Sequence, residues 1–456
     1  MRLAAIGAGL LALVMSATAA DAQLFGGEEP VVRKPARATK AKPKAVPTAA
    51  AAAAATGAAA ATAIAGPVTP PPPNNGCRNT GTFEAFMADF RRQAIAAGIS
   101  PATIQRTLDG LTLDQGIISR DRHQSFFSQT FIDFSTKLAT NNRLKNGIAN
   151  VRKHAAVFDR AEKEYGVPPA VIAAFWALES DFGSAPGMGK HGVLRSLATL
   201  AYDCRRGEMF RVELLAALKI IERGDLTPEE MTGSWAGELG QTQFLPSHYF
   251  NYAVDYDGDG RRDLYRSIPD VIGSSAYFVA QLGWRRGEPW LTEVRVPQEL
   301  PWDQADLAIQ HPRSKWAKWG VTLADGQPLP DDALPSSLLL LQGRHGPAFL
   351  VYPNFQIYLK WNQSLTYTTT AAYLATRIQG APAMSHGNGP LPPALPYEQL
   401  KELQILLARH GHDVGEPDGK LGSATRKAVR QMQIKLGQPA DSYPSMELLE
   451  ALRRQR

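Results

Sequence analysis

The sequence predicts a mainly α-helical protein with a small β element, followed by a separate unit of three helices. Apolar residues recur at helical spacing from residue 82 onward, and few stretches alternate as strands do. A Gly/Pro-rich segment, 383–396, divides the chain. With 456 residues, of which 44% are hydrophobic and 20% charged, the chain is long enough to bury a large core.

The amino terminus has the pattern of a secretory signal peptide over residues 1–22. Arg2 precedes a short apolar stretch, and Ala20 and Ala22 form an A-x-A arrangement that predicts cleavage before Gln23. An uncleaved anchor is the alternative, but the stretch is short for a membrane span. No cysteine lies near the cleavage site, which argues against a lipid anchor. The mature chain is therefore expected to be exported without a transmembrane span.

Residues 23–76 are rich in Ala, Pro, Thr and Lys and predict a disordered tether, because they offer few large apolar side chains to offset ordering entropy. Six Lys and Arg residues against two Glu residues give this tether a net charge of +4 out of the total of +6. The folded remainder is nearly neutral. The high pI is therefore poor evidence for nucleic-acid binding, and no nucleic-acid partner is expected.

The chain has two cysteines, Cys77 and Cys204. An even number of cysteines in an exported protein favours a disulfide between them, which would connect the start of the folded region to a distant site. Two independent buried thiols are the alternative.

The large domain, expected over 77–382, opens with a helix whose apolar face is Phe83, Phe86, Met87, Phe90 and Ala94. Ser100-Pro101 predicts a helix start, and so does a capping box at Thr227–Glu230. Further helices are expected at about 121–139, 150–165, 168–180, 207–223 and 270–283, and strands at 338–341, 349–352 and 357–359.

The last sixty residues, 397–456, form an independent unit. Leu400, Leu403 and Leu407 line a first helix, Ser423 begins a second, and a third is expected over 446–452.

Glu179 stands out because it directly follows the apolar run Phe175–Leu178 in "AAFWALESDFGS". Desolvation at the end of a buried helix would raise its pKa from about 4.3 toward neutrality and make it a proton donor near neutral pH. A helix-end carboxylate that points into water is the alternative. Asp181 is too close in sequence to act from the opposite side of a substrate.

The stretch "GSWAGELGQTQFLPSHY" combines small residues, which allow close backbone approach, with neutral hydrogen-bonding side chains at 241–243, 247 and 248. Such groups beside aromatic rings suit a sugar better than a phosphate. The stretch "YLKWNQSLTY" adds aromatic residues, Trp361 and Tyr367, that could stack on sugars or pack in the core. The described motifs include no paired histidine spacing and no phosphate-binding glycine loop.

The stretch "DYDGDGRRD" predicts a structural calcium site. Asp255, Asp257, Asp259 and Asp263 occupy alternate positions of an EF-hand-like loop, and Gly260 would provide its sharp turn. Arg261 would contribute a backbone carbonyl. Arg266 stands where a bidentate Glu is expected, and Asp270 is the candidate replacement. A metal-free acidic turn is the alternative.

Five motifs in this order, "ALESDFG", "LATLAYDCRR", "GSWAGELGQTQFLPS", "DYDGDGRRDLYRSIPDVIGS" and "WNQSLTY", resemble the bacterial lytic murein transglycosylases of the membrane-bound transglycosylase B type. The resemblance covers about residues 77–382. The tail resembles the peptidoglycan-binding domain of wall enzymes, whose "DG-x-x-G-x-x-T-R" pattern falls here on Asp418, Gly419, Gly422, Thr425 and Arg426.

The resemblance implies a lysozyme-like fold, a periplasmic location and cleavage of the β-1,4 bond between N-acetylmuramic acid and N-acetylglucosamine. Glu179 would protonate the glycosidic oxygen and then accept the proton of the muramic acid 6-hydroxyl, which yields a 1,6-anhydro end. No cofactor would take part in the chemistry. A hydrolytic muramidase and a catalytically silent peptidoglycan-binding scaffold are the alternatives.

The same resemblance implies that Ser234 and Gln243 bind substrate near Glu179, and that Asn362 and Tyr367 line the cleft. Arg205 and Arg206 would face carboxylates of the stem peptide, although surface salt bridges are the alternative. The expected partners are glycan strands, stem peptides and other cell-wall enzymes. One departure is Phe278, because relatives often carry a hydroxyl-bearing residue at that position.

Overall fold

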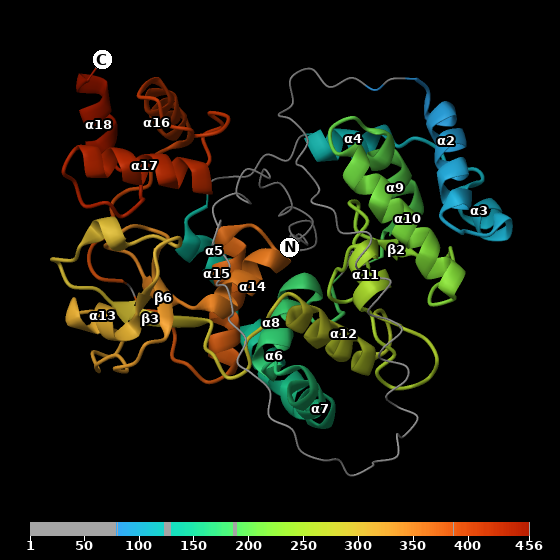
Figure 1. Ribbon diagram of the computed structural model, residues 1–456, viewed down its shortest axis with the longest axis horizontal. Helices are drawn as coiled ribbons and strands as arrows, with labels where there is room; N and C mark the ends of the chain where they lie inside the picture. Colours follow the sequence, from blue (N-terminus) through green and yellow to red (C-terminus); the bar gives the residue numbers. More distant parts are fainter. Residues whose placement is uncertain (1–78, 80, 123–128, 186–188, 386, 456) are drawn as a thin grey trace, which may run out of the picture. The chain divides into compact units, whose positions relative to one another are not determined.

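The computed structural model describes residues 79, 81–122, 129–185, 189–385 and 387–455. The expected signal peptide and tether, and Cys77, lie outside these residues. Within them, no helix combines the length and the apolarity that crossing a membrane requires. Figure 1 shows a mainly helical large region with a small sheet, and a carboxyl-terminal group of three helices.

A first group of helices surrounds a large apolar core. Its members are α2 (Phe83–Ala96), α3 (Pro101–Leu108), α4 (Gln115–Arg122), α9 (Val193–Tyr202), α10 (Gly207–Arg223) and α11 (Pro246–Tyr252). The five apolar residues expected to face the core from α2 are all buried, and Ser100 caps α3 with Pro101 in its first turn. A two-stranded ribbon of β1 (His191–Gly192) and β2 (Thr232–Gly233) lies beside this core.

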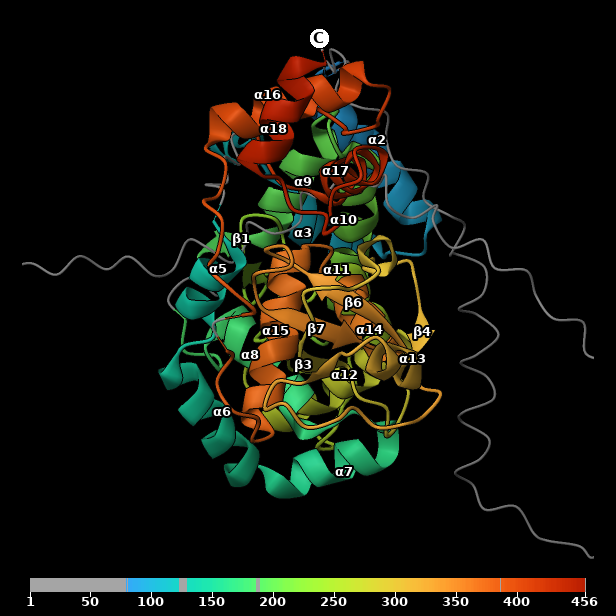
Figure 2. The same ribbon diagram turned by 90° about the vertical axis from the view of Figure 1, so that its left-hand side faces the viewer.

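A second group contains the helix that ends near Glu179. It comprises α5 (Phe131–Leu138), α6 (Asn141–Lys153), α7 (Ala155–Tyr165), α8 (Pro169–Ser180), α12 (Ile268–Gln281), α14 (Pro353–Trp361) and α15 (Leu365–Ile378). Residues of α8, α12, α14, α15 and the sheet share one core, and Figure 2 shows α14 and α15 beside the sheet. Nearly every side chain of α8 is buried, because the helix has neighbours on all sides.

The sheet has five antiparallel strands in the order β4-β6-β7-β3-β5. These are β3 (Leu291–Arg295), β4 (His311–Pro312), β5 (Thr322–Leu323), β6 (Pro335–Leu340) and β7 (Ala348–Val351), with the short helix α13 (Arg313–Lys318) between β4 and β5. Leu339 of β6 faces the core around α8, while Leu338 and Leu340 face a separate core on the other side. Burial of both faces explains why this strand is apolar without alternation.

The carboxyl-terminal unit consists of α16 (Tyr397–Arg409), α17 (Ser423–Lys435) and α18 (Met446–Arg454) around their own core. Gln404 of α16 donates to the side chains of Asp418, in the turn before α17, and of Thr425, in α17. Arg426 of α17 makes its hydrogen bonds outside this unit. Its guanidinium donates to the backbone carbonyls of Leu340 and Leu341 at 3.4 and 2.7 Å. The segment expected to be a linker also makes contacts, since the Ser385 hydroxyl donates to Glu293 at 2.5 Å.

Several expected elements differ from the structure. The helix expected at 121–139 is not continuous, because α4 ends at Arg122 and a new helix begins after the N-cap Thr130. The helix expected at 150–165 is divided at His154. The segment 357–359 is helical and not a strand, since it lies within α14. The capping box of Thr227 and Glu230 forms its reciprocal hydrogen bonds, yet it closes a turn and not a helix.

Candidate active site

Glu179 is the penultimate residue of α8. Pro169 begins this helix, where its fixed φ is favourable and its missing N–H costs nothing. The helix ends at Asp181, which is its C-cap in the left-handed conformation with φ of 48°. Asp181 therefore belongs to the helix end, in agreement with the sequence prediction.

One oxygen of the Glu179 carboxylate is held by two donors. The indole N–H of Trp361 donates to Oε1 at 3.1 Å, and the hydroxyl of Tyr367 makes a short hydrogen bond to the same atom. Oε2 accepts no hydrogen bond from the part of the chain that the structure describes. The carboxyl group is therefore fixed through Oε1, and Oε2 remains for a proton and a substrate oxygen.

The environment of Glu179 favours its protonated form. Burial raises the pKa of Glu179 to about 7, and the hydrogen bonds from Tyr367 and Trp361 oppose this rise without cancelling it. The negative charge of Glu238 raises the pKa further, whereas Arg143 lowers it. The sequence alternative of a Glu that points into water does not fit, because Trp361 and Tyr367 hold the carboxyl group against α14 and α15.

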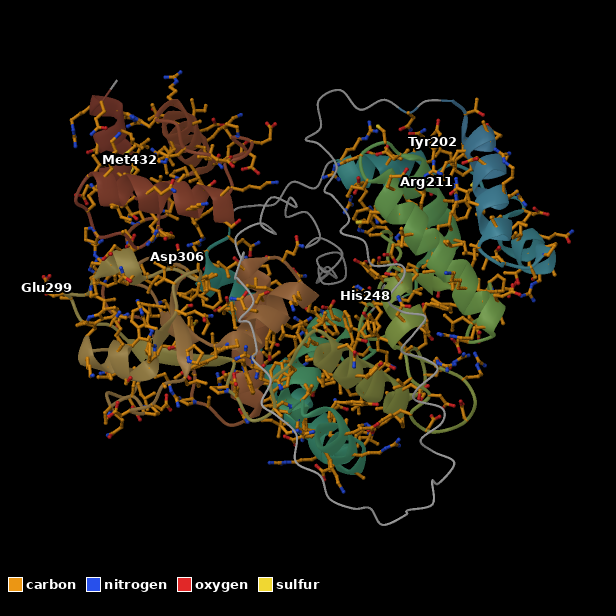
Figure 3. All side chains as sticks on the ribbon, viewed as in Figure 1. Tyr202, Arg211, His248, Glu299, Asp306 and Met432 are labelled. Atoms are coloured by element: carbon orange, nitrogen blue, oxygen red, sulfur yellow. The ribbon has the colours of Figure 1, made fainter. Side chains whose placement is uncertain are left out.

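Trp361 is itself held by aromatic rings. It stacks on Phe175 of α8, with ring centroids 4.1 Å apart and an interplanar angle of 16°, and it packs against Phe244 and Phe278. Phe278, the departure noted in the sequence, thus supports the tryptophan that binds Glu179. His248 of α11, labelled in Figure 3, packs on Phe278 with ring centroids 4.6 Å apart.

The neutral side chains of the loop 233–248 divide into two sets. Gln241 accepts from the Trp176 indole at 2.8 Å and donates to the Tyr265 carbonyl at 2.7 Å, so it is used within the core. Ser247 and Thr242 are likewise hydrogen-bonded inside the protein. Gln243 is partly exposed, and its amide donates to the Gly240 carbonyl at 2.8 Å.

Ser234, a predicted substrate-binding residue, is 7% exposed and fully engaged in its loop. Its hydroxyl makes a short hydrogen bond to the carboxylate of Glu238 and accepts the N–H groups of Ala236 and Glu238 at 3.0 and 3.2 Å. A serine hydroxyl has one donor and two acceptor positions, and all three are occupied.

Asn362 and Tyr367 lie at the junction of α14 and α15. Asn362 is the C-cap of α14, and its side-chain oxygen accepts the Ser364 N–H at 2.9 Å. It is partly exposed. Tyr367 is only 2% exposed, so its hydroxyl serves Glu179 and its ring is not open for stacking on a sugar.

Arg205 and Arg206 both bind one buried carboxylate. Asp121 of α4 is 1% exposed and accepts from Arg205 at 2.7 Å and from Arg206 through a short contact. The guanidinium groups therefore have a structural role between α4 and α10. The Arg205 bonds to the Asp121 carbonyl and carboxylate are both made by one of its guanidinium nitrogens, Nη1.

The acidic loop brings only part of the predicted calcium ligands together. Side-chain oxygens of Asp255, Asp257 and Asp259 lie within 4.8 Å of one another. The structure departs from the expectation for Asp263 and Asp270, which are outside this cluster. Asp270 is fully buried and accepts the N–H groups of Tyr256 and Asp263, each at 2.7 Å. It therefore closes the loop from inside.

The remaining part of the loop is held by local bonds. Asp263 pairs with Arg266 at 2.6 Å, which explains why an arginine occupies the twelfth position. The Arg261 backbone N–H donates to Asp259 at 2.8 Å, and Gly260 has the positive φ of 91° that a sharp turn requires.

Cys204 is disulfide-bonded, and the chain contains one other cysteine, Cys77.

Sequence reasoning missed two charged residues near Glu179. Glu238 lies in "WAGELG", where flanking glycines suggest a solvent-exposed turn, yet it is 7% exposed. Arg143 lies 36 residues before Glu179 on α6 and carried no motif. The only sign in the sequence that Glu238 is buried was the pair of apolar residues in the same stretch, Trp235 and Leu239. No sequence feature pointed to Arg143.

Comparison with known proteins decides the family. The family model described as "Transglycosylase SLT domain" matches residues 82–376, which is more than half of the chain. The chain belongs to this family. A second model, for a peptidoglycan binding domain, matches residues 396–452. The combination of a transglycosylase domain and a peptidoglycan-binding domain agrees with the resemblance found in the sequence.

Individual relatives agree with this membership. The membrane-bound lytic murein transglycosylase B of Escherichia coli is 32% identical over 249 residues, which are 54% of this chain and 67% of that protein. SltB3 from Pseudomonas aeruginosa, solved in complex with NAG-anhNAM-pentapeptide, is 40% identical with a TM-score of 0.76 over 82% of this chain and all of that chain. The Escherichia coli lytic transglycosylase Slt35 in complex with calcium is 27% identical, with a TM-score of 0.55 over 67% of this chain and 94% of that chain.

Proposed function

We propose that Glu179 is the single acid–base residue of a lytic transglycosylase reaction on peptidoglycan. The bond cleaved is the β-1,4 linkage between N-acetylmuramic acid and N-acetylglucosamine. Protonated Glu179 donates from Oε2 to the glycosidic oxygen. The resulting carboxylate accepts the proton of the muramic acid 6-hydroxyl as that oxygen attacks C1, and a 1,6-anhydro end forms without water.

The main support for this mechanism is the environment of Glu179. Its pKa of about 7 supplies protonated and ionised forms near neutral pH, which both steps require. Tyr367 and Trp361 hold Oε1, so the two steps use the same free oxygen. Asp181 is paired with Arg143, which leaves it no role as a second acid. This arrangement supports a one-carboxylate mechanism over hydrolysis by two carboxylates.

Two partly exposed polar residues, Gln243 and Asn362, are proposed to contact the substrate. Gln243 and Asn362 supply amides for N-acetyl and hydroxyl groups of the sugars, and Tyr367 contributes by holding the acid. Ser234 is proposed to support substrate binding indirectly, because its hydroxyl holds the loop in place through Glu238 and two backbone N–H groups. Arg205 and Arg206 attract stem-peptide carboxylates through the positive charge of their guanidinium groups. The carboxyl-terminal domain holds the enzyme on the same polymer, and other cell-wall enzymes are proposed partners.

A calcium ion is proposed as a structural cofactor, while the chemistry needs none. The clustered oxygens of Asp255, Asp257 and Asp259 are the ligands that calcium prefers, and the Arg261 carbonyl is the next one along the loop. Asp263 and Asp270 hold the loop around that site. The Slt35 structure with calcium supports the proposal. The signal-peptide pattern of residues 1–22 supports a periplasmic location for the proposed activity.

Digestion of purified sacculi followed by mass spectrometry tests the function. The wild type should release muropeptides with 1,6-anhydro ends, each one water lighter than a hydrolysed product. Glu179→Gln should lower the rate about 10²-fold to 10⁴-fold, because the amide of Gln is far too weak an acid to protonate the glycosidic oxygen. Glu213→Gln, at another buried glutamate, should retain activity. Release of reducing ends alone, or an active Glu179→Gln variant, would contradict the proposal.

The same variant should keep its fold. A carboxyl group whose pKa is raised in the folded state loses stability as pH rises from its unfolded value, about 4.3, through its folded value, about 7. Gln does not titrate and avoids this cost. Glu179→Gln should therefore unfold at a temperature equal to or higher than the wild type at pH 8, and lost activity with a lower melting temperature would point to misfolding.

A further inference from the structure

The carboxyl-terminal unit carries an exposed aromatic ring. Tyr397 is the first residue of α16, and it is 49% exposed. Every other Phe, Tyr and Trp whose exposure the structure describes is buried or partly buried. The Tyr397 ring is therefore the aromatic surface that this part of the chain offers to a ligand with a flat apolar face.

The Tyr397 ring rests on Gly419, in the turn before α17. A Cβ added to Gly419 would lie 2.5 Å from both Cδ2 and Cε2 of the ring, so only glycine allows this approach. The side chain of Gln404 fixes the turn, because its Oε1 accepts the Gly419 N–H at 2.7 Å and its Nε2 donates to Asp418 at 3.2 Å. The ring is therefore positioned before a ligand binds, which lowers the entropy that binding costs.

Two charged side chains flank Gly419 in the same turn. Asp418 and Lys420 form an ion pair at 4.0 Å, and both side chains reach the surface. A sugar ring has an apolar C–H face and a rim of hydroxyl and acetamido groups. An aromatic ring with charged hydrogen-bonding groups beside it matches both features of such a ligand.

Another face of the unit is covered by the large region. In addition to the hydrogen bonds of Arg426, Asp441 accepts the Arg344 N–H at 3.1 Å, and Ala440 is buried in the core on the outer side of the sheet. These contacts occupy α17 and the turn that follows it. Tyr397 remains exposed in their presence, so it lies on a surface that a long polymer can still reach.

We propose that Tyr397 is a sugar-stacking residue by which the carboxyl-terminal unit binds the glycan strand of peptidoglycan. One N-acetylhexosamine lies with its C–H face on the exposed face of the ring, and polar groups at its rim contact Asp418 and Lys420. The match to a peptidoglycan binding domain supplies the class of polymer, and the supported ring supplies the place. The inference rests on the function proposed above, because it locates the wall contact of the same enzyme.

Pelleting with purified sacculi tests the inference. The full chain carrying Glu179→Gln is the reference, so that cleavage does not interfere with binding. Adding Tyr397→Ala should raise the apparent Kd about fivefold to tenfold, because an aromatic contact residue is lost. Tyr397→Phe keeps the ring and should bind as the reference does. Ile434→Ala, at an exposed apolar residue of α17, should also bind as the reference does.

Chitin separates a glycan contact from a peptide contact, because it consists of N-acetylglucosamine without stem peptides. Tyr397→Ala should weaken binding to chitin beads as well as to sacculi. Equal binding of Tyr397→Ala and the reference to sacculi would overturn the inference. A loss on sacculi with unchanged binding to chitin, or a reference that does not bind chitin, would also overturn it.

Melting temperatures control for the fold of each variant. If Tyr397→Ala unfolds the unit, Tyr397→Leu replaces it, since Leu keeps an apolar contact with Gly419 but has no planar ring. The same loss of binding is expected, and unchanged binding of folded Tyr397→Leu would count against stacking. A wild type without anhydromuropeptides would instead refute the proposed function, and the binding comparison would remain measurable.

Discussion

Arg143 of α6 holds Asp181, the C-cap of α8, through a bidentate ion pair two residues beyond Glu179. The two N–H···O distances are 2.5 and 2.9 Å, and a third donor of Arg143 reaches the Leu138 carbonyl at 3.0 Å. The Arg143 side chain is 12% exposed, so the pair is partly shielded from water. One guanidinium thus connects the corner between α5 and α6 to the end of the helix that carries the acid.

Breaking this pair from either side should separate its structural role from its electrostatic one. Arg143→Met and Asp181→Asn should each cost about 1–2 kcal/mol in unfolding free energy, because a partly buried charge loses its partner. Arg143 lowers the pKa of Glu179, so Arg143→Met should also move the alkaline activity limb to higher pH. Asp181→Asn should not move it upward. Denaturant unfolding and pH profiles measure both effects, and identical upward shifts would contradict the assignment.

Tyr367→Phe removes the short hydrogen bond to Glu179 Oε1. That bond lowers the pKa of Glu179, so its loss should raise the pKa and move the alkaline limb of kcat/KM to higher pH. The carboxyl group is also held less firmly, and kcat should fall about tenfold. Steady-state kinetics across pH measures both changes.

Tyr358→Phe is the matched control for this prediction. Tyr358 is a buried tyrosine of α14 whose hydroxyl has no hydrogen-bond partner within the described residues. Its removal should leave the pH profile unchanged and stability equal or slightly higher, since a buried unsatisfied group is lost. Equal effects of the two substitutions would show that the hydroxyl of Tyr367 has no special role.

Gly183 is needed for its conformation and for its lack of a side chain. Its φ is +79°, and an added Cβ would lie 2.4 Å from Gln241 Oε1, the atom that accepts from Trp176. Gly183→Ala should cost about 1 kcal/mol of backbone strain and roughly 1–3 kcal/mol more from overlap. Gly287→Ala, with φ of +76° and open space around its Cβ, should show the backbone cost alone. Equal melting temperatures for both variants would exclude the close contact.

Chelation should lower stability through the acidic loop. If calcium binds the cluster at Asp257, excess calcium stabilises the folded state by mass action, and its removal should lower the melting temperature by roughly 5 °C. Asp257→Asn should abolish this sensitivity. Asp325→Asn, in a turn where Asp325 accepts the Gln327 N–H, should preserve it. A melting temperature insensitive to chelator and to added calcium would remove the metal proposal.

Local patterns in the sequence predicted the elements whose formation depends on nearby residues. The apolar face of α2, the Ser100 cap and the bounds of α10 followed from helical periodicity and capping chemistry. The failures occurred where tertiary contacts decide. The segment 357–359 has β-branched and aromatic residues, yet it is helical because Phe355 and Tyr358 pack on the core around α8.

For the site, the sequence by itself determined that Glu179 ends an apolar helix and that Asp181 belongs to the helix end, because both depend on residues within a few positions. Only the tertiary structure decided which charges surround that acid. Arg143 and Glu238 reach Glu179 from separate elements, and electrostatic interactions between them depend on distance in space and on burial. Sequence spacing carries no information on either quantity.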